Sequence, residues 1–412
     1  MNIEGSPEAA GMSSERLGRL DPVLQSYIDK GAVRGISAAV SRRGQVVYHR
    51  QFGHRDQEAG APMEADTIFR IYSMTKPIVS TALMLLHEEG KFQLEHPVAN
   101  YLPAFGATKV MAPDGSLVDQ NRPMQVRELL MHTSGLTYDF MEDTPVGQMY
   151  RDARIMNDAT RPLSALIDDL AQIPLASQPG QRWHYSVGID VAARLVELLA
   201  DQPLGEFLAE RIFNPLGMTD TAFGVPEAKR ERLAAMYGLP DLVGEGYTGS
   251  QLVQAALGGF NERIDVSATY PVDSPEVFVR GGLGLFSTLD DYLRFAQMLA
   301  NNGALEGSRI IGRKTLELMH QNHLPSALIP FEIMAQPMLG YGFGLGSRVM
   351  VDVAASAGPG SLGEYGWAGA AKTYYWVDPA EDLVGVFMSQ YMTGPLGPDR
   401  DFRSLVYQAI VD

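Results

Sequence analysis

A helix that begins at Ser73-Met74-Thr75-Lys76-Pro77 limits the possible folds of this chain more than any other segment. Apolar residues follow Pro77 at helical spacing and predict a helix over about 78–90. Proline has no backbone N–H and is tolerated in the first turn, so Pro77 places the helix start close to Ser73. Ser73 and Lys76 then share one face at the positive end of the helix dipole. This arrangement can supply a nucleophile and the base that activates it.

A second motif contains a tyrosine that could reach this serine. Trp183-His184-Tyr185-Ser186-Val187 lies between the turn residues Gln178-Pro179-Gly180 and an apolar pattern that predicts a helix over 189–200. Tyr185 is therefore expected on a loop that enters a helix. A phenol there can relay a proton to and from the Ser73 hydroxyl. The alternative is a purely structural role, since Tyr185 is one of 17 tyrosines.

A third motif indicates a strand that passes close to the nucleophile. Tyr365-Gly366-Trp367-Ala368-Gly369-Ala370 precedes Lys372-Thr373-Tyr374-Tyr375-Trp376-Val377, an alternating aromatic segment that predicts a strand. Small residues at 368–370 would let the strand edge approach Ser73 closely. A backbone N–H from this edge and the N–H of Ser73 would make an oxyanion hole with two donors. Tight packing alone is the other explanation for these small residues.

In this order and at this spacing, the three motifs resemble those of the serine β-lactamase and penicillin-binding-protein superfamily. Within it, the chain is most similar to class C β-lactamases and family VIII carboxylesterases. The resemblance runs from about residue 10 to the C-terminus. It implies an α/β (α+β) fold, with an antiparallel sheet flanked by helices and a mostly helical lobe. The supporting segments are Leu129-Leu130-Met131-His132-Thr133-Ser134-Gly135-Leu136, Asn214-Pro215-Leu216-Gly217-Met218 and Gly281-Gly282-Leu283-Gly284-Leu285-Phe286-Ser287-Thr288.

Two departures from the β-lactamase pattern bear on the substrate. Trp367-Ala368-Gly369 stands where lactamases have Lys-Thr-Gly, and Val187 stands where they have the asparagine of Tyr-x-Asn. The cation that holds the carboxylate of the antibiotic and the amide-binding asparagine are therefore both missing. An indole offers one neutral donor and a large apolar face, so a pocket lined by Trp367, Ala368 and Gly369 should favour uncharged acyl groups.

The resemblance also implies a role for individual residues. Ser73 would be the nucleophile, Lys76 the general base and Tyr185 its proton-relay partner, while the N–H groups of Ser73 and Ala370 would form the oxyanion hole. The expected activity is that of a serine carboxylesterase, which hydrolyses short- to medium-chain esters through an acyl-enzyme on Ser73. A β-lactamase or amide hydrolase, an acyltransferase and a non-catalytic penicillin-binding-like protein are the alternatives.

Other catalytic patterns do not account for the chain. No Gly-x-Ser-x-Gly occurs, which excludes the nucleophile turn of α/β-hydrolases. His320 and His323 lack the His-Glu-x-x-His pattern, so no metal site is expected, and the proposed chemistry needs no cofactor. His184 is expected to be satisfied by a backbone carbonyl.

Composition restricts the partners and the location. The net charge of −16 argues against nucleic acid or an anionic membrane as a partner, which leaves a small-molecule ester as the expected one. No apolar run is long enough to span a bilayer, and residues 1–30 contain no secretory signal. A cytoplasmic location is therefore expected, unless a leader is removed. The oligomeric state is left open, and the absence of cysteine excludes disulfides.

The order of the predicted elements suggests two lobes. Residues 1–75 and 281–412 would form an α/β lobe that carries the sheet, and residues 76–280 a mostly helical lobe inserted between them, with the site in the cleft. A long pocket-facing loop is expected over 232–280. Further helices are expected at 14–30, 125–131, 162–172, 204–213 and 402–411, and strands at 36–41, 45–51, 342–351, 365–377 and 382–390.

Overall fold

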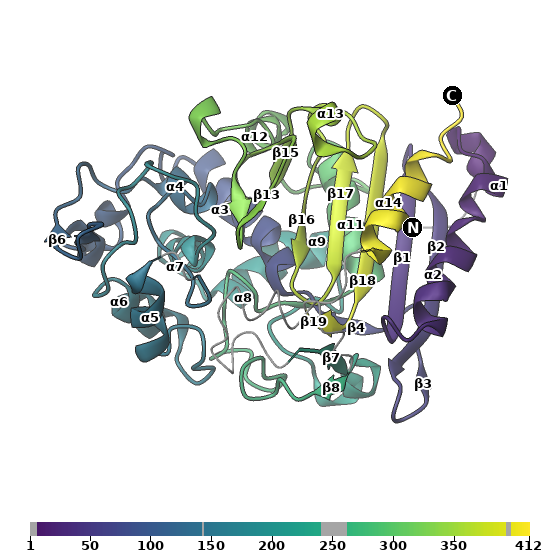
Figure 1. Ribbon diagram of the computed structural model, residues 1–412, viewed down its shortest axis with the longest axis horizontal. Coiled ribbons are helices and arrows are strands. Elements are labelled where there is room, and N and C mark those ends of the chain that lie inside the picture. Colours follow the sequence, from purple (N-terminus) through teal and green to yellow (C-terminus); the bar gives the residue numbers. More distant parts are fainter. Residues whose placement is uncertain (1–5, 142–143, 240–261, 393–396) are drawn as a thin grey trace.

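The computed structural model describes residues 6–141, 144–239, 262–392 and 397–412. Its largest element is a sheet of eight strands, in which every neighbouring pair is antiparallel (Figure 1). In spatial order the strands are β14 (Tyr341–Phe343), β15 (Arg348–Met350), β16 (Tyr365–Gly369), β17 (Thr373–Asp378), β18 (Leu383–Ser389), β1 (Gly35–Arg42), β2 (Gln45–Asp56) and β3 (Ala61–Pro62).

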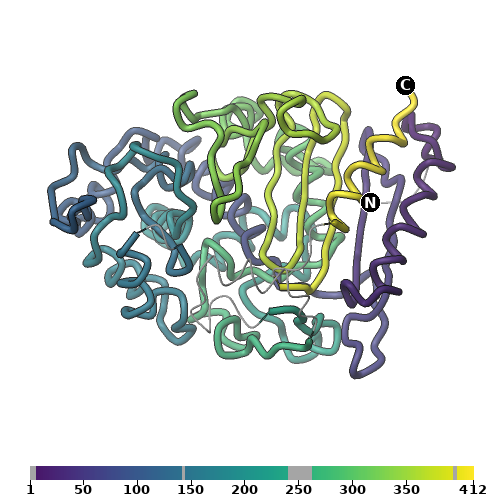
Figure 2. Tube along the Cα trace, in the orientation of Figure 1, coloured from purple at the N-terminus to yellow at the C-terminus, as the bar shows by residue number. Residues whose placement is uncertain are grey.

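Both faces of the sheet are covered by helices. Alternate side chains of a strand point to opposite faces, so neighbouring residues of β1 show what packs on each side. Ala38 and Val40 of β1 join the apolar cluster that contains helices α2 (Leu20–Asp29) and α14 (Pro398–Tyr407). Ala39 joins the main core on the other face, where helix α11 (Leu289–Ala300) contacts β1, β17 and β18. The sheet is therefore the middle of three layers, and the C-terminal helix α14 lies beside it with the N-terminal helix α2 (Figure 2).

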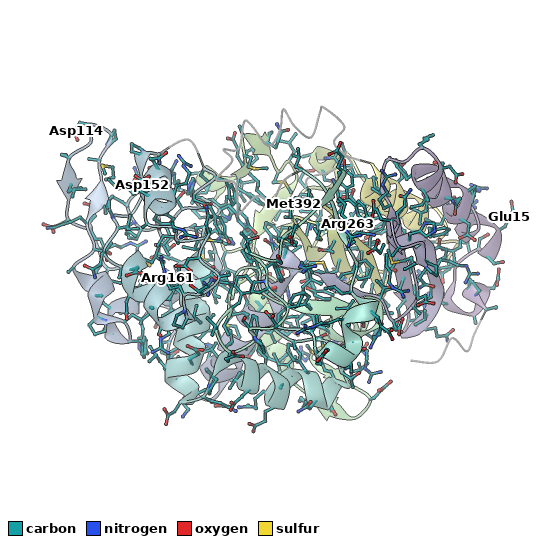
Figure 3. The ribbon with its side chains drawn as sticks, turned by 90° about the horizontal axis from the view of Figure 1, so that it is seen from below. Glu15, Asp114, Asp152, Arg161, Arg263 and Met392 are labelled. Atoms are coloured by element: carbon teal, nitrogen blue, oxygen red, sulfur yellow. The ribbon has the colours of Figure 1, made fainter. Side chains whose placement is uncertain are left out.

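A mostly helical region lies at the opposite end of the molecule from α1 and α2, and Figure 3 shows Asp114 at one end and Glu15 at the other. Helix α3 links it to the sheet by packing against α7. The two-lobe division at residues 75 and 281 stays a prediction. The remaining helices are α1 (Ser14–Leu17), α3 (Thr75–Glu88), α4 (Val126–Leu130), α5 (Pro145–Asp152), α6 (Leu163–Leu170), α7 (Gly188–Ala200), α8 (Leu204–Leu208), α9 (Asn214–Leu216), α12 (Arg313–Met319) and α13 (Val353–Ser356).

Short strands make the other sheets. Strands β4 and β9 pair beside the start of α3, and β12 and β13 form an isolated hairpin. Their bounds are β4 (Ile68–Arg70), β5 (Val110–Met111), β6 (Leu117–Val118), β7 (Met236–Gly238), β8 (Glu262–Ile264), β9 (Phe286–Thr288), β10 (Ala304–Leu305), β11 (Ser308–Arg309), β12 (Glu332–Ile333), β13 (Gln336–Pro337) and β19 (Tyr391–Met392).

Most of the elements expected from the sequence are present, and five segments differ. The helix predicted over 14–30 is two helices, α1 and α2, and the one predicted over 204–213 changes from α8 to a π-helix at Ala209. The segments 342–351 and 365–377 are each two strands, because the chain turns at positive φ at Gly346 and Lys372. The long loop expected over 232–280 contains β7 and β8, and its residues 240–261 lie outside the described part.

A buried histidine beneath β16 leads to a prediction about acid stability. His320 stacks on Tyr365 at 3.5 Å between ring centroids, and burial lowers the pKa of His320 to about 3. An unfolded histidine titrates near 6.5, so the unfolded chain binds more protons as the pH falls from about 6.5 to 3, and stability is lost over that window. His320→Phe should keep the stack on Tyr365. Between pH 7 and pH 4, its free energy of unfolding in urea titrations should fall by about 3 kcal/mol less than that of wild type. An equal loss would contradict this.

Candidate active site

Ser73 lies in a strained turn directly before helix α3. It occupies a 3-10 turn, Tyr72–Met74, which joins β4 to α3. Tyr72 has φ 44°, a left-handed conformation that is uncommon for a residue with a side chain. Its ring packs edge-on against Tyr270, with 4.9 Å between ring centroids. Such backbone strain persists only where the surrounding packing enforces it, and it concentrates at functional sites.

The Lys76 ammonium or amine group meets three oxygen atoms. Lys76 is 1% exposed in the first turn of α3. Its Nζ lies 3.1 Å from Ser73 Oγ, 2.9 Å from Tyr138 Oη and 2.6 Å from the carbonyl oxygen of Gly282. A charged lysine donates to all three. A neutral lysine has two N–H groups and one lone pair. The Gly282 carbonyl oxygen can only accept, so one N–H donates to it and the other can donate to Tyr138 Oη. The lone pair is then free to point at the Ser73 hydroxyl.

Tyr185 reaches Ser73 from the helical region. It lies on the loop that precedes α7, as the sequence predicts, and its Oη donates to Ser73 Oγ at 2.8 Å. The Tyr185 ring stacks on Trp183, with 6.1 Å between ring centroids, and contacts the His132 ring at 4.8 Å; His132 and Trp183 also contact each other, at 5.7 Å. Burial lowers the pKa of His132 well below its usual value, so this neighbour stays neutral. The structure therefore brings Ser73, Lys76 and Tyr185 into one hydrogen-bonded group.

Tyr138 is a member of this group that the sequence motifs did not identify. It is buried, it accepts a hydrogen bond from Lys76, and it stacks on Phe140 at 4.9 Å. Burial raises the pKa of Tyr138 well above its usual value, so it remains a neutral phenol. Tyr138 belongs to none of the three motifs. The hint in the sequence was its position two residues after Leu136, where a segment that supported the resemblance ends.

Strand β16 approaches the turn that carries Ser73 from the sheet. A Cβ added to Gly369 would lie 2.3 Å from the carbonyl oxygen of Ile71, so no side chain fits there. Thr373 Oγ1 donates to the same carbonyl at 3.2 Å. Ala370 follows the end of β16 and lines the same pocket as Ser73. The sequence also predicts that Gly369 lines this pocket, but Gly369 is not among the described residues of the pocket wall. Its role is to let the strand lie close to Ile71.

The pocket in front of Ser73 is mainly apolar. It encloses ≈ 260 Å³, and Trp367 and Ala368 line it as predicted. Hairpin β12–β13 forms part of its wall, through Ile333 and through Met334 in its turn. Asp139 and Arg348 add charged side chains to this lining. The other apolar residues of the wall are Phe140, Met156, Leu283 and Met338.

The histidines outside this group have ordinary hydrogen-bond partners. His184 Nε2 lies 2.7 Å from the Thr137 hydroxyl, a side-chain partner in addition to whatever the backbone supplies to this ring. His320 and His323 each meet a main-chain carbonyl oxygen. Within the described ranges, no three His, Asp or Glu side chains gather as possible metal ligands. Also within those ranges, no helix has both the length and the apolar character needed to cross a bilayer.

A serine whose hydroxyl contacts both a buried lysine and a tyrosine, beside strand β16 of an antiparallel sheet, defines a serine hydrolase with the β-lactamase fold. The chain belongs to the beta-lactamase family, whose model matches residues 20–409. It is 35% identical to an uncharacterized protein of Mycobacterium tuberculosis, over 89% of this chain and 88% of the other. It is 32% identical to the esterase EstB of Burkholderia gladioli, over 92% of each chain.

A solved structure supports the same class. The chain is similar to EstCE1, described as a hydrolase with promiscuous acyltransferase activity, with a TM-score of 0.78 and 28% sequence identity. The alignment covers 95% of this chain and 98% of EstCE1. Together with EstB, this likeness supports an esterase or acyltransferase of the superfamily.

The two tyrosines that contact the group are expected to differ in importance. Tyr185→Phe removes the donor to Ser73 and should reduce kcat by roughly 10²- to 10⁴-fold, the usual contribution of a positioned proton donor or acceptor. Tyr138→Phe removes only one acceptor of Lys76 and should cost about 10-fold. Steady-state ester hydrolysis by the two variants provides the measurement. Equal losses would show that the contact with Ser73 is not what matters.

Proposed function

We propose that this protein is a serine carboxylesterase that hydrolyses short- to medium-chain esters through an acyl-enzyme on Ser73. The observation that carries the proposal is the position of Ser73 Oγ, which lies between Lys76 Nζ at 3.1 Å and Tyr185 Oη at 2.8 Å. The apolar pocket with Trp367 in its lining supports an uncharged acyl group as the ligand.

Acylation begins with neutral Lys76. Its lone pair takes the proton of Ser73 as Oγ attacks the ester carbonyl carbon, and the carbonyl oxygen becomes an oxyanion. The N–H groups of Ser73 and Ala370 stabilise this charge, which fits the contact of the end of β16 with Ile71. The intermediate then collapses. The bond to the alcohol oxygen breaks, and the alcohol leaves with the proton from Lys76, relayed through Tyr185.

Deacylation repeats the sequence with water. Lys76 is neutral again after the alcohol has left, so it takes a proton from a water molecule that attacks the acyl carbon. Collapse of the second intermediate returns the proton to Ser73 Oγ and releases the acid. Covalent catalysis thus replaces one difficult displacement by two easier ones.

Transfer of the acyl group to an alcohol is a second candidate activity. The mainly apolar lining around Ser73 favours it, because an apolar wall binds an alcohol that carries a hydrocarbon group better than it binds water. EstCE1, with its promiscuous acyltransferase activity, is a structural relative. An alcohol that attacks the same acyl-enzyme would yield a new ester and needs no additional catalytic group.

The test compares p-nitrophenyl acetate, butyrate and caprylate with a chromogenic cephalosporin, and adds benzyl alcohol to one ester series. The proposal predicts that esters are cleaved much faster than the cephalosporin. Better turnover of the cephalosporin would contradict the expected effect of Trp367. Formation of benzyl esters at the expense of acid would favour the transferase, and no turnover of any ester would refute both activities.

A further inference from the structure

We propose that Asp190 is a positioning residue that acts on Lys76 both through the backbone of Gly282 and through its own negative charge. The inference rests on the proposed function, because it assigns Lys76 the role of the base. Asp190 lies in the first turn of α7, where it is 1% exposed. It is absent from the described lining of the pocket, so its carboxylate acts from behind the catalytic group.

Gly282 connects the two charged side chains on its opposite sides. Its N–H donates to Asp190 Oδ1 at 3.1 Å. Its carbonyl oxygen accepts from Lys76 Nζ at 2.6 Å, which is the shortest of the three contacts of that nitrogen. Asp190 thus fixes the orientation of the residue that holds Lys76, and a small rotation of Gly282 would move the Nζ atom relative to Ser73.

The contact between Asp190 and Gly282 is too close for any side chain. A Cβ on Gly282 would lie 2.6 Å from Asp190 Oδ2 and 3.0 Å from Tyr138 Oη. A Cβ on Gly281 would lie 2.5 Å from both the Ala193 Cβ and the Ile189 carbonyl oxygen of α7. The two glycines therefore let the main chain lie directly on the helix that carries Asp190. This explains the Gly-Gly pair that the sequence places before Leu283.

The charge of Asp190 has a use that a hydrogen bond alone does not explain. Burial raises the pKa of Asp190, and the nearby charge of Lys76 opposes that effect. Oδ2 is buried and has no hydrogen-bond partner in the described part of the chain. An asparagine would satisfy the Gly282 N–H at less desolvation cost. The carboxylate offsets its desolvation cost if its charge stabilises the ammonium that forms when Lys76 takes the Ser73 proton.

Several other titratable groups surround this pair, and they determine how the charge should be tested. Arg280 also interacts with Asp190, while the rings of Tyr138 and Tyr185 lie 5.4 and 4.7 Å from Lys76 Nζ. His132 is neutral, as described above. Since these groups stay in place in a variant of Asp190, a change in the pH dependence would report the loss of the Asp190 charge.

The experiment replaces Asp190 by asparagine, which keeps an acceptor oxygen for the Gly282 N–H and removes the charge. At the pH plateau, kcat for p-nitrophenyl acetate should fall by roughly 10- to 100-fold with little change in KM, because the developing ammonium loses its counter-charge. The acid limb of the kcat/KM profile should move to lower pH by about one unit or more, because a buried negative charge that favours a cation beside the Gly282 carbonyl has been removed.

A matched control is available in α11. Asp291 is also a buried carboxylate in the first turn of a helix, and it accepts a backbone N–H, that of Asp220, at 2.7 Å. Asp291→Asn should change thermal stability without moving the acid limb. Asp190→Cys provides a second neutral variant, since a buried thiol behaves as a small apolar group and the natural chain has no other cysteine.

The outcomes separate this inference from the proposed function. An unmoved acid limb in folded Asp190→Asn or Asp190→Cys would overturn the role of Asp190 and leave the esterase proposal intact. Failure of both variants to fold, while Asp291→Asn folds, would assign Asp190 to the fold and also overturn it. If wild type cleaves no ester, the proposed function itself fails, and this inference fails with it.

Discussion

Ser73→Ala is expected to reduce the turnover of p-nitrophenyl butyrate by roughly 10⁴- to 10⁶-fold, the largest effect of any substitution considered. The reason is that Ser73 Oγ is the atom on which Lys76 and Tyr185 converge, and alanine offers nothing that can form an acyl-enzyme. The measurement is steady-state hydrolysis, together with mass spectrometry after treatment with a fluorophosphonate. Wild type should gain one phosphonyl group, and the variant none.

Ser80→Ala serves as the matched control for this substitution. Ser80 is a fully buried serine on the same helix, and its Oγ has no hydrogen-bond partner in the described part of the chain. Its replacement should leave turnover and labelling unchanged. If Ser73→Ala retained more than about a hundredth of the wild-type rate while folded, the nucleophile would have to be another residue.

Lys76→Met should have the second largest effect, a loss of roughly 10²- to 10⁴-fold in kcat, the range expected when a general base is removed. Methionine has about the same length but has no lone pair that can take the Ser73 proton at neutral pH. The burst of p-nitrophenol should disappear, because acylation itself becomes slow. The variant should also lose the acid limb of the pH profile, because a methionine side chain has no group that can be protonated there.

A lysine elsewhere provides the comparison for Lys76→Met. Lys229 is paired with Asp220 and does not line the pocket in the described structure. Lys229→Met should therefore keep the burst and the pH profile. A Lys76→Met enzyme with an intact acid limb would show that another group is the base.

The sequence alone was sufficient to predict the local features of the site. Pro77 and the apolar spacing after it placed the start of a helix near Ser73, and α3 begins at Thr75. The turn residues before Trp183 placed Tyr185 on a loop before a helix, and that loop precedes α7. Such predictions succeed because they depend on contacts between neighbours along the chain.

Contacts between distant segments could not be predicted in this way. Tyr138 meets Lys76 across 62 positions of sequence, and Gly282 meets it across 206. Neither has a local signal, because a tyrosine after a helix and a pair of glycines each have many structural explanations. The division of segment 342–351 into β14 and β15 was missed for a related reason: apolar residues stand on both sides of the turn at Gly346, at a spacing that one strand would also show.

The β12–β13 hairpin separates the choice of substrate from the chemistry. Among the residues that the structure describes, its strands pair only with each other, and its turn, Met334-Ala335, has positive φ at both residues. Ser73, Lys76 and Tyr185 all lie outside it, although Ile333 and Met334 form part of the pocket wall. Acyl preference can therefore be engineered by randomising or exchanging this hairpin as a module. Such libraries would diversify selectivity while leaving the reacting groups in place.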